Sequence, residues 1–170
     1  GEFQGLLTVD SNLINFGKLP EVDLLASSFA GGASGFPLCF DNYTENEKQN
    51  YIDRNRKSIK ITNTKNIEIT QAKYFMPYAG FFTEKAERDK YIKKLNKKNS
   101  VQDYQKLCDK NNCILLDINK NQFFQFHGKK LLNQFKDNSE RYLDSSFKDI
   151  LNNAVKITKD EVKKIVINYF

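Results

Sequence analysis

The sequence of 170 residues contains no tryptophan, a single histidine and only three cysteines, Cys39, Cys108 and Cys113. An odd number of cysteines at this low density excludes a disulfide-based scaffold and favours a reducing compartment. No run approaches the ~18 consecutive apolar residues of a membrane-spanning helix, and no apolar leader with a cleavage site occurs near the N-terminus. We therefore predict a cytoplasmic protein that does not contact a membrane.

What the sequence does contain is typical of a globular domain. Charged residues make up 28% and hydrophobic residues 39%, with 14 Phe and 8 Tyr to fill a core. The length fits one domain. The net charge of +6 would suit an anionic partner, but the lysines are scattered among asparagines rather than gathered in one stripe. We therefore predict no nucleic-acid binding.

Apolar runs of strand length alternate with helical patterns, which predicts a mixed α/β fold. Strands are expected at residues 6–9, 22–29, 72–76, 113–118 and 122–126, with the last two forming a hairpin through a turn at residues 119–121. Helices are expected from Thr44 to about Lys60, from Thr83 to about Asn96, from Ser100, over residues 143–156 and from Thr158. Residues 63–66 are expected to form a polar loop.

Residues 29–37, Phe-Ala-Gly-Gly-Ala-Ser-Gly-Phe-Pro, are the most informative segment of the chain. Three glycines and a serine follow an apolar strand pattern, and glycine reaches positive φ while letting backbone N–H groups approach a ligand. Successive N–H groups in such a turn can cradle an anion such as phosphate. The alternative is a tight turn that binds no ligand.

Residues 22–37 resemble the metallo-β-lactamase-fold part of the CMP-N-acetylneuraminate hydroxylases, in which an apolar strand also runs into this nine-residue turn. Similar segments occur in the same order on both sides of it. They are Thr8-Val9-Asp10, Lys18-Leu19-Pro20, Arg56-Lys57, residues 77–82 and residues 89–93. The resemblance covers about residues 2–124.

The resemblance implies an αββα sandwich of the metallo-β-lactamase type, of which this chain would hold the second half. Residues 1–170 would then be a single domain or domain fragment, with residues 1–126 in the metallo-β-lactamase-like part and residues 127–170 as a helical extension. That fold usually binds metal through a His-x-His-x-Asp-His loop, which a chain with His127 as its only histidine cannot supply. The loop is therefore expected in an upstream half of the same domain, and His127 is interpreted as a loop or hairpin-end residue.

Asp10 is the residue that the resemblance implies as a metal ligand, because Thr8-Val9-Asp10 matches the family's Thr-Val-Asp at the end of a strand. A lone carboxylate there could instead form an Asx-turn or a cap. The family has Ser-Asp-Phe before the glycine turn, whereas this chain has Ser27-Ser28-Phe29. Ser28 therefore removes a carboxylate near the expected site.

The resemblance places substrate on the glycine turn and on two neighbouring segments. The expected substrate-binding residues are Gly31, Gly32, Ser34, Gly35, Arg56, Lys57 and Tyr78. Arg56 and Lys57 could bind a phosphate or a carboxylate, or they could belong to a solvated helix face. Ala79 and Gly80 could leave space for substrate, or they could allow a close crossing of two segments.

In the hydroxylase family a mononuclear iron hydroxylates the N-acetyl group of CMP-sialic acid, with electrons delivered through a Rieske iron–sulfur cluster from a b-type cytochrome and its reductase. The resemblance therefore implies part of an iron-dependent monooxygenase with a nucleotide-sugar substrate, inactive as this chain alone. The ligands of a Rieske domain are not encoded, and Cys108 and Cys113 are expected in the core. Two alternatives stay open: a hydrolase of the same fold that acts on a phosphate ester or amide, and a non-catalytic module for binding or assembly.

Overall fold

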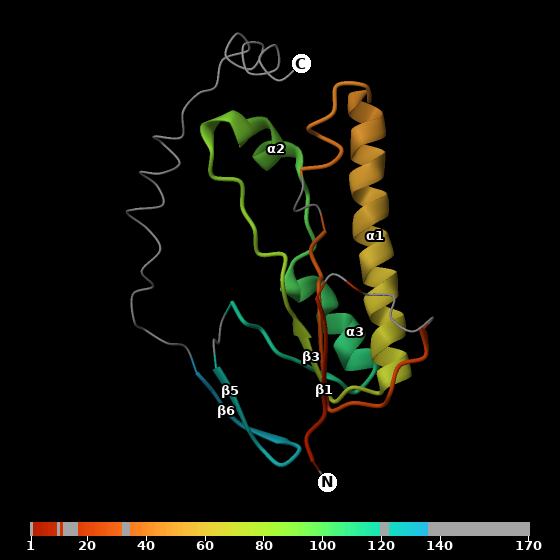
Figure 1. Ribbon diagram of the computed structural model, residues 1–170, viewed down its shortest axis with the longest axis vertical. Helices are drawn as coiled ribbons and strands as arrows, with labels where there is room; N and C mark the ends of the chain where they lie inside the picture. Colours follow the sequence, from red (N-terminus) through yellow and green to blue (C-terminus); the bar gives the residue numbers. More distant parts are fainter. Residues whose placement is uncertain (1, 10, 12–16, 32–34, 120–122, 136–170) are drawn as a thin grey trace, which may run out of the picture. The chain divides into compact units, whose positions relative to one another are not determined.

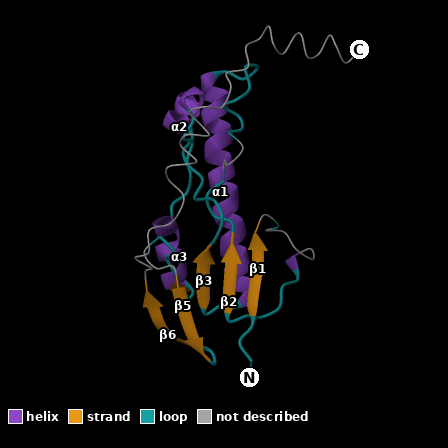
Figure 2. Cartoon of the chain, turned by 60° about the vertical axis from the view of Figure 1, so that its left-hand side comes forward, coloured by secondary structure: helices purple, strands orange, loops and turns teal. Residues whose placement is uncertain are grey.

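A computed structural model describes residues 2–9, 11, 17–31, 35–119 and 123–135. Its centre is a four-stranded parallel sheet with the strand order β1-β2-β3-β4. Figure 1 shows the path of the chain, and Figure 2 shows β1, β2 and β3 side by side. The strands are β1 (Gly5–Val9), β2 (Leu24–Ser27), β3 (Tyr74–Pro77) and β4 (Ile114–Leu115). The predicted mixed α/β class is confirmed.

Helix α1 (Glu45–Thr70) connects β2 to β3. It begins at the predicted place, where the Glu47 N–H donates to Thr44 Oγ1 and the Thr44 N–H donates to Glu47 Oε2. The predicted end near Lys60 and the predicted loop at residues 63–66 are wrong, because the helix continues for ten residues past Lys60. Asn63 and Asn66 are buried rather than solvated, and Asn63 finds a hydrogen-bond partner inside the protein.

Short helices connect β3 to β4. They are η2 (Glu87–Asp89), α2 (Lys90–Leu95), η3 (Val101–Tyr104) and α3 (Gln105–Lys110). The predicted helix from Thr83 starts later than expected, because Glu84 is buried and pairs with Lys98 instead of opening a helix. The predicted start at Ser100 is confirmed, and its N–H donates to the Asp103 carboxylate at 2.7 Å.

The main core lies between one face of the sheet and helices α1 and α3, which both lie on that side (Figure 2). Neighbouring strands place Leu25, Phe75 and Leu115 side by side, and these residues pack with Ile67 of α1 and Tyr104 of η3. Cys108 and Cys113 belong to the same cluster, as predicted. A hydrogen bond with Cys113 and burial raise the pKa of the Cys108 thiol, which keeps it protonated in the core.

The antiparallel hairpin of β5 (Phe123–His127) and β6 (Lys130–Phe135) packs against the sheet through Tyr74. The Phe126 ring lies 5.1 Å from the Tyr74 ring, and the Leu131 N–H donates to the Tyr74 hydroxyl at 2.9 Å. Residues at 113–118 and 122–126 therefore do not form the predicted hairpin, since β4 instead pairs in parallel with β3.

The proposed division of the chain at residue 126 stays a prediction. Residues 127–135, the first of the expected helical extension, contain the end of β5 and all of β6. The helices expected over residues 143–156 and from Thr158 lie outside the described residues. None of the helices in the described ranges combines the length and apolar character that a bilayer crossing requires.

Candidate functional site

The carboxyl ends of β1, β2 and β3 meet at one edge of the sheet, because the strands are parallel. Ligands of open α/β sheets commonly bind at this edge. Two hydrogen bonds tie the three strand ends together here: Thr8 Oγ1 donates to Ser27 Oγ at 2.9 Å, and the Tyr78 N–H donates to the Ser27 carbonyl at 2.8 Å. The predicted substrate residue Tyr78 thus lies at the end of β3, with its side chain 37% exposed.

The first residues of the glycine turn leave this edge and are held by three buried polar side chains. The hydrogen bonds run from Asn63 Nδ2 to Ser28 O (3.0 Å), from Tyr104 Oη to Phe29 O (2.9 Å) and from Asn99 Nδ2 to Phe29 O (3.1 Å). The backbone N–H of Asn99 adds a fourth bond, to Ala30 O at 3.1 Å. The carbonyl groups of residues 28–30 therefore all have partners within the described part of the chain.

Tyr104 acts in this network as a neutral donor. Its side chain is fully buried, and burial raises its pKa to about 12. The hydroxyl therefore keeps its proton at physiological pH and donates it to the Phe29 carbonyl. The turn is fixed without a formal charge.

Two glycines occupy positions in which any other residue would be strained. Gly31 has φ +72°, and a Cβ there would lie 2.9 Å from Ile59 Cδ1 of α1. Gly80 has φ +117°, and a Cβ there would lie 2.7 Å from Ala30 Cβ and 3.2 Å from Ala30 N. Gly80 thus lets the segment after β3 cross the glycine turn closely, which is one of the two readings that the sequence left open.

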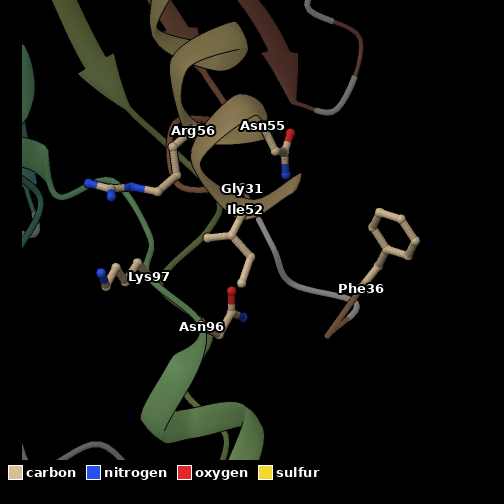
Figure 3. A pocket seen from close by; sticks show the side chains of 7 residues that line it. All are labelled: Gly31, Phe36, Ile52, Asn55, Arg56, Asn96 and Lys97. Atoms are coloured by element: carbon tan, nitrogen blue, oxygen red, sulfur yellow. The ribbon is translucent and has the colours of Figure 1, made fainter. Parts of the chain in front are cut away.

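A small pocket lies where the turn approaches α1 (Figure 3). Its lining residues are Gly31, Phe36, Ile52, Asn55, Arg56, Asn96 and Lys97. Figure 3 shows the side chains of Arg56 and Lys97 on one side of the pocket, with Asn55 and Phe36 on the other. The volume of about 10 Å³ has room for a single water molecule, so a larger ligand would have to lie across the mouth of the pocket.

Of the two basic residues predicted to bind substrate, Arg56 is the one that lines the pocket at the turn. Its Nε is buried and has no hydrogen-bond acceptor within the described residues, and its Nη1 lies 3.6 Å from the Asp53 carboxylate. The Arg56 carbonyl accepts a hydrogen bond from Asn99, the residue that also holds the turn. Lys57, the other predicted basic residue, is exposed and does not line the pocket.

A second depression of about 310 Å³ includes Gly35, near the end of the turn. Its lining residues are Gly35, Cys39, Phe82, Glu84, Arg88, Asp89 and Ile92. Burial opposes ionisation of Glu84, but hydrogen bonds from its own N–H, Asn96 and Lys98 together with the Lys98 charge lower its pKa. Gly35 therefore lies in a different depression from Gly31, while Gly32, Ser34 and Asp10 lie outside the described residues.

Within the described ranges, no three histidine, cysteine, aspartate or glutamate side chains are grouped so that they could hold a metal ion. His127 lies at the end of β5, where it is exposed and pairs in register with Lys130. The donor set that an iron or zinc ion needs is not assembled by these residues.

The sequence analysis missed Asn63, Asn99 and Tyr104 as residues that position the turn. A signal for Asn63 existed, because Ile52, Ile59, Asn63 and Ile67 recur at helical spacing along one face. If Asn63 is counted as an inward-facing residue, the predicted helix extends past Lys60 and the Asn63 amide lies in the core. No comparable signal exists for Tyr104, since spacing along a helix does not reveal the hydrogen-bond partner of a hydroxyl.

No protein-family model and no solved structure matches the chain. The cytidine monophosphate-N-acetylneuraminic acid hydroxylase of Danio rerio is 43% identical over 115 residues, 64% of this chain and 20% of that protein. The protein of that name from Mus musculus is 38% identical over 120 residues, 67% of this chain and 21% of its own length. A human protein named as the inactive form is also 38% identical over 120 residues, 67% of this chain and 24% of the human protein.

The matched region spans about a fifth of the length of these relatives. The similarity agrees with the resemblance carried by the glycine turn and its flanking segments. Over about two thirds of its length, this chain is a partial match to the cytidine monophosphate-N-acetylneuraminic acid hydroxylase family.

Proposed function

We propose that this chain forms one wall of the substrate site in an enzyme that hydroxylates the N-acetyl group of CMP-sialic acid or a related nucleotide sugar. The relatives are named for a hydroxylase of cytidine monophosphate-N-acetylneuraminic acid. The observation that carries the proposal is the glycine turn at the carboxyl edge of the sheet, held by Asn63, Asn99 and Tyr104 beside Arg56.

Such a turn suits an anionic substrate group. Asn63, Asn99 and Tyr104 hold the carbonyls of Ser28 and Phe29 inside the protein, so the backbone that enters the turn does not have to be reordered when a ligand binds. In the proposed complex, amides of the turn and the guanidinium of Arg56 bind a phosphate or a sialic acid carboxylate. A guanidinium can donate two parallel hydrogen bonds to either group.

We also propose that the complete fold is the αββα sandwich of the metallo-β-lactamases. In support, the helices cover one face of the sheet, while apolar residues remain exposed on the other. Leu7 and Ile114 alternate with the core residues Leu6 and Leu115 along their strands, and they are 59% and 52% exposed. A second sheet packed on that face would bury them.

Iron, a Rieske cluster and electron donors of the b-type cytochrome and reductase kind belong to the proposed whole enzyme. The described residues do not assemble an iron site. We therefore place the metal-binding half of the domain and the Rieske domain in regions that correspond to parts of the relatives beyond the matched fifth. On this proposal the 170-residue chain binds the nucleotide sugar weakly and does not turn it over.

A binding experiment tests the proposal through Arg56. The full chain is titrated with CMP-N-acetylneuraminic acid by isothermal calorimetry, using Arg56→Gln and, as a matched control, Lys65→Gln on an exposed part of α1. Loss of charge-assisted hydrogen bonds is expected to weaken binding about 10-fold in Arg56→Gln and less than about 2-fold in the control. Absence of binding by the unaltered chain, or equal weakening by both variants, would contradict the proposal.

A further inference from the structure

Four aromatic side chains gather on the segment that follows the glycine turn and on the first turns of α1. They are Phe36, Phe40, Tyr43 and Tyr51, and we name them the aromatic cluster. Five ring pairs within it have centroid separations of 5.2 to 6.4 Å, all in edge-to-face geometry. The guanidinium of Arg54 lies 5.6 Å from the centre of the Tyr51 ring.

Two rings of the aromatic cluster are partly exposed to solvent. Phe36 is 40% exposed and Phe40 is 47% exposed. Burying their rings would stabilise the protein, because removal of apolar surface from water is favourable. Exposed apolar patches of this kind commonly mark binding surfaces. The aromatic cluster therefore offers ring surface to a ligand.

Phe36 joins the aromatic cluster to the candidate site. It belongs to the cluster and also lines the pocket at Gly31 (Figure 3). On the same side of that pocket lies the exposed amide of Asn55, with Arg56 and Lys97 on the other side. An aromatic surface, an amide and two cations thus follow one another across the mouth of the pocket.

This order of groups matches the parts of a pyrimidine nucleotide. A base stacks on aromatic rings, an amide can both donate to and accept from the edge of cytosine, and cations bind phosphate. We propose that the aromatic cluster is the subsite for the pyrimidine base of the nucleotide sugar, with Asn55 facing the polar edge of the base. This inference rests on the proposed function, since the relatives are named for a cytidine nucleotide.

The test compares two ligands that differ in the base. The full chain is titrated with CMP and with ribose 5-phosphate, and amide chemical shifts are followed by NMR. We expect the unaltered chain to bind CMP about 10-fold more tightly than ribose 5-phosphate, because stacking on an aromatic side chain contributes that much per base. Phe40→Ala should bring the ratio of the two affinities close to one without changing the affinity for ribose 5-phosphate.

Two further variants control for folding and for aromatic exposure. Phe40→Leu keeps an apolar side chain while removing the ring, so it should also lower the ratio even if Phe40→Ala disturbs the segment. Phe135→Ala removes a ring that is 50% exposed on β6, outside the aromatic cluster, and should leave the ratio unchanged. Equal affinities in the unaltered chain, or an unchanged ratio in both Phe40 variants, would overturn the base subsite alone. Failure to bind either ligand would overturn the proposed function as well.

Discussion

The two ends of the parallel strands are held by different chemistry. At the carboxyl edge, neutral side chains bind the carbonyl groups of the glycine turn. At the amino edge, the buried carboxylate of Asp23 accepts from the Gln4 N–H at 3.0 Å and pairs with Lys129 at 3.1 Å and Lys73 at 3.5 Å. One edge is thus fixed by uncharged hydrogen bonds, and the other by ion pairs whose lysines reach solvent.

Uncharged hydrogen bonds and ion pairs respond differently to salt and pH. Neutral buried donors such as Tyr104 carry no charge that salt could screen, and the raised pKa of Tyr104, about 12, keeps its proton in place over a wide range of pH. Ion pairs with partly exposed lysines are weakened by salt and by acid. At Asp23 they attach the β5–β6 hairpin to the sheet through Lys129, at the end of the strands opposite the glycine turn.

The largest expected effect is at Tyr104. Tyr104→Ala removes a fully buried ring that packs on Phe29 and Phe75, so the free energy of unfolding should fall by ~3–5 kcal/mol. Tyr104→Phe keeps the ring and removes the hydroxyl, and it should cost ~1–2 kcal/mol with the same value at pH 5 and pH 7. Urea unfolding measures both. If Tyr104→Phe left the free energy of unfolding unchanged, the hydroxyl would not be holding the turn.

A smaller loss is expected where the segment after β3 crosses the turn. Gly80→Ala combines a positive φ with a Cβ placed 2.7 Å from Ala30, so the free energy of unfolding should fall by ~2–3 kcal/mol. Gly128→Ala is the matched control, because Gly128 has φ +53° with open space around it and should cost only ~1 kcal/mol. Thermal melts measure the stability of both variants. Equal losses in Gly80→Ala and Gly128→Ala would show that the close contact with Ala30 has no cost of its own.

The smallest effect is expected at Asp23. Burial opposes ionisation of this carboxyl, but hydrogen bonds from Gln4 and Lys129 and the charges of Lys129 and Lys73 lower its pKa below the usual value. Asp23→Asn should therefore reduce the free energy of unfolding by ~1–2 kcal/mol at pH 7, a modest value because both lysines are partly exposed.

The stabilisation by Asp23 should depend on pH in one direction. A carboxyl with a lowered pKa in the folded state stabilises the fold above its unfolded pKa of about 4, and this contribution is lost as the pH falls through the folded pKa. The difference between the unaltered protein and Asp23→Asn should therefore be full at pH 7 and should shrink below about pH 4. Urea unfolding at both pH values checks it, and a difference that grows in acid would refute the assignment.

Local patterns in the sequence predicted the local parts of the fold. The capping residues Thr44 and Ser100 and the strands before the glycine turn and before Pro77 lie where the patterns placed them. The end of α1 was missed because polar Asn63 and Asn66 resemble a loop when only neighbouring residues are considered, and it is the fold that brings the Asn63 Nδ2 to the Ser28 carbonyl. The prediction for β4 was wrong for a related reason. Adjacency in sequence favoured a hairpin with the next strand, whereas in the fold β4 pairs with the edge of β3.

For the candidate site, the sequence indicated the turn and Arg56 but not what holds them. Gly31 and Arg56 line one pocket, whereas Gly35 belongs to a different depression and Lys57 to the exposed surface. Adjacent residues on a helix point about 100° apart, so Arg56 and Lys57 cannot both face the turn. Only the fold decides which of the two does.

The sequence by itself determined the similarity to the hydroxylases, the strand that enters the glycine turn and the helix starts at Thr44 and Ser100, because these depend on residues close together in the chain. The tertiary structure decided how the turn is held. Asn63 reaches Ser28 across 35 positions, and Tyr104 reaches Phe29 across 75. Contacts between residues so far apart leave no periodic signal, and they exist only once the sheet and α1 have brought the partners together.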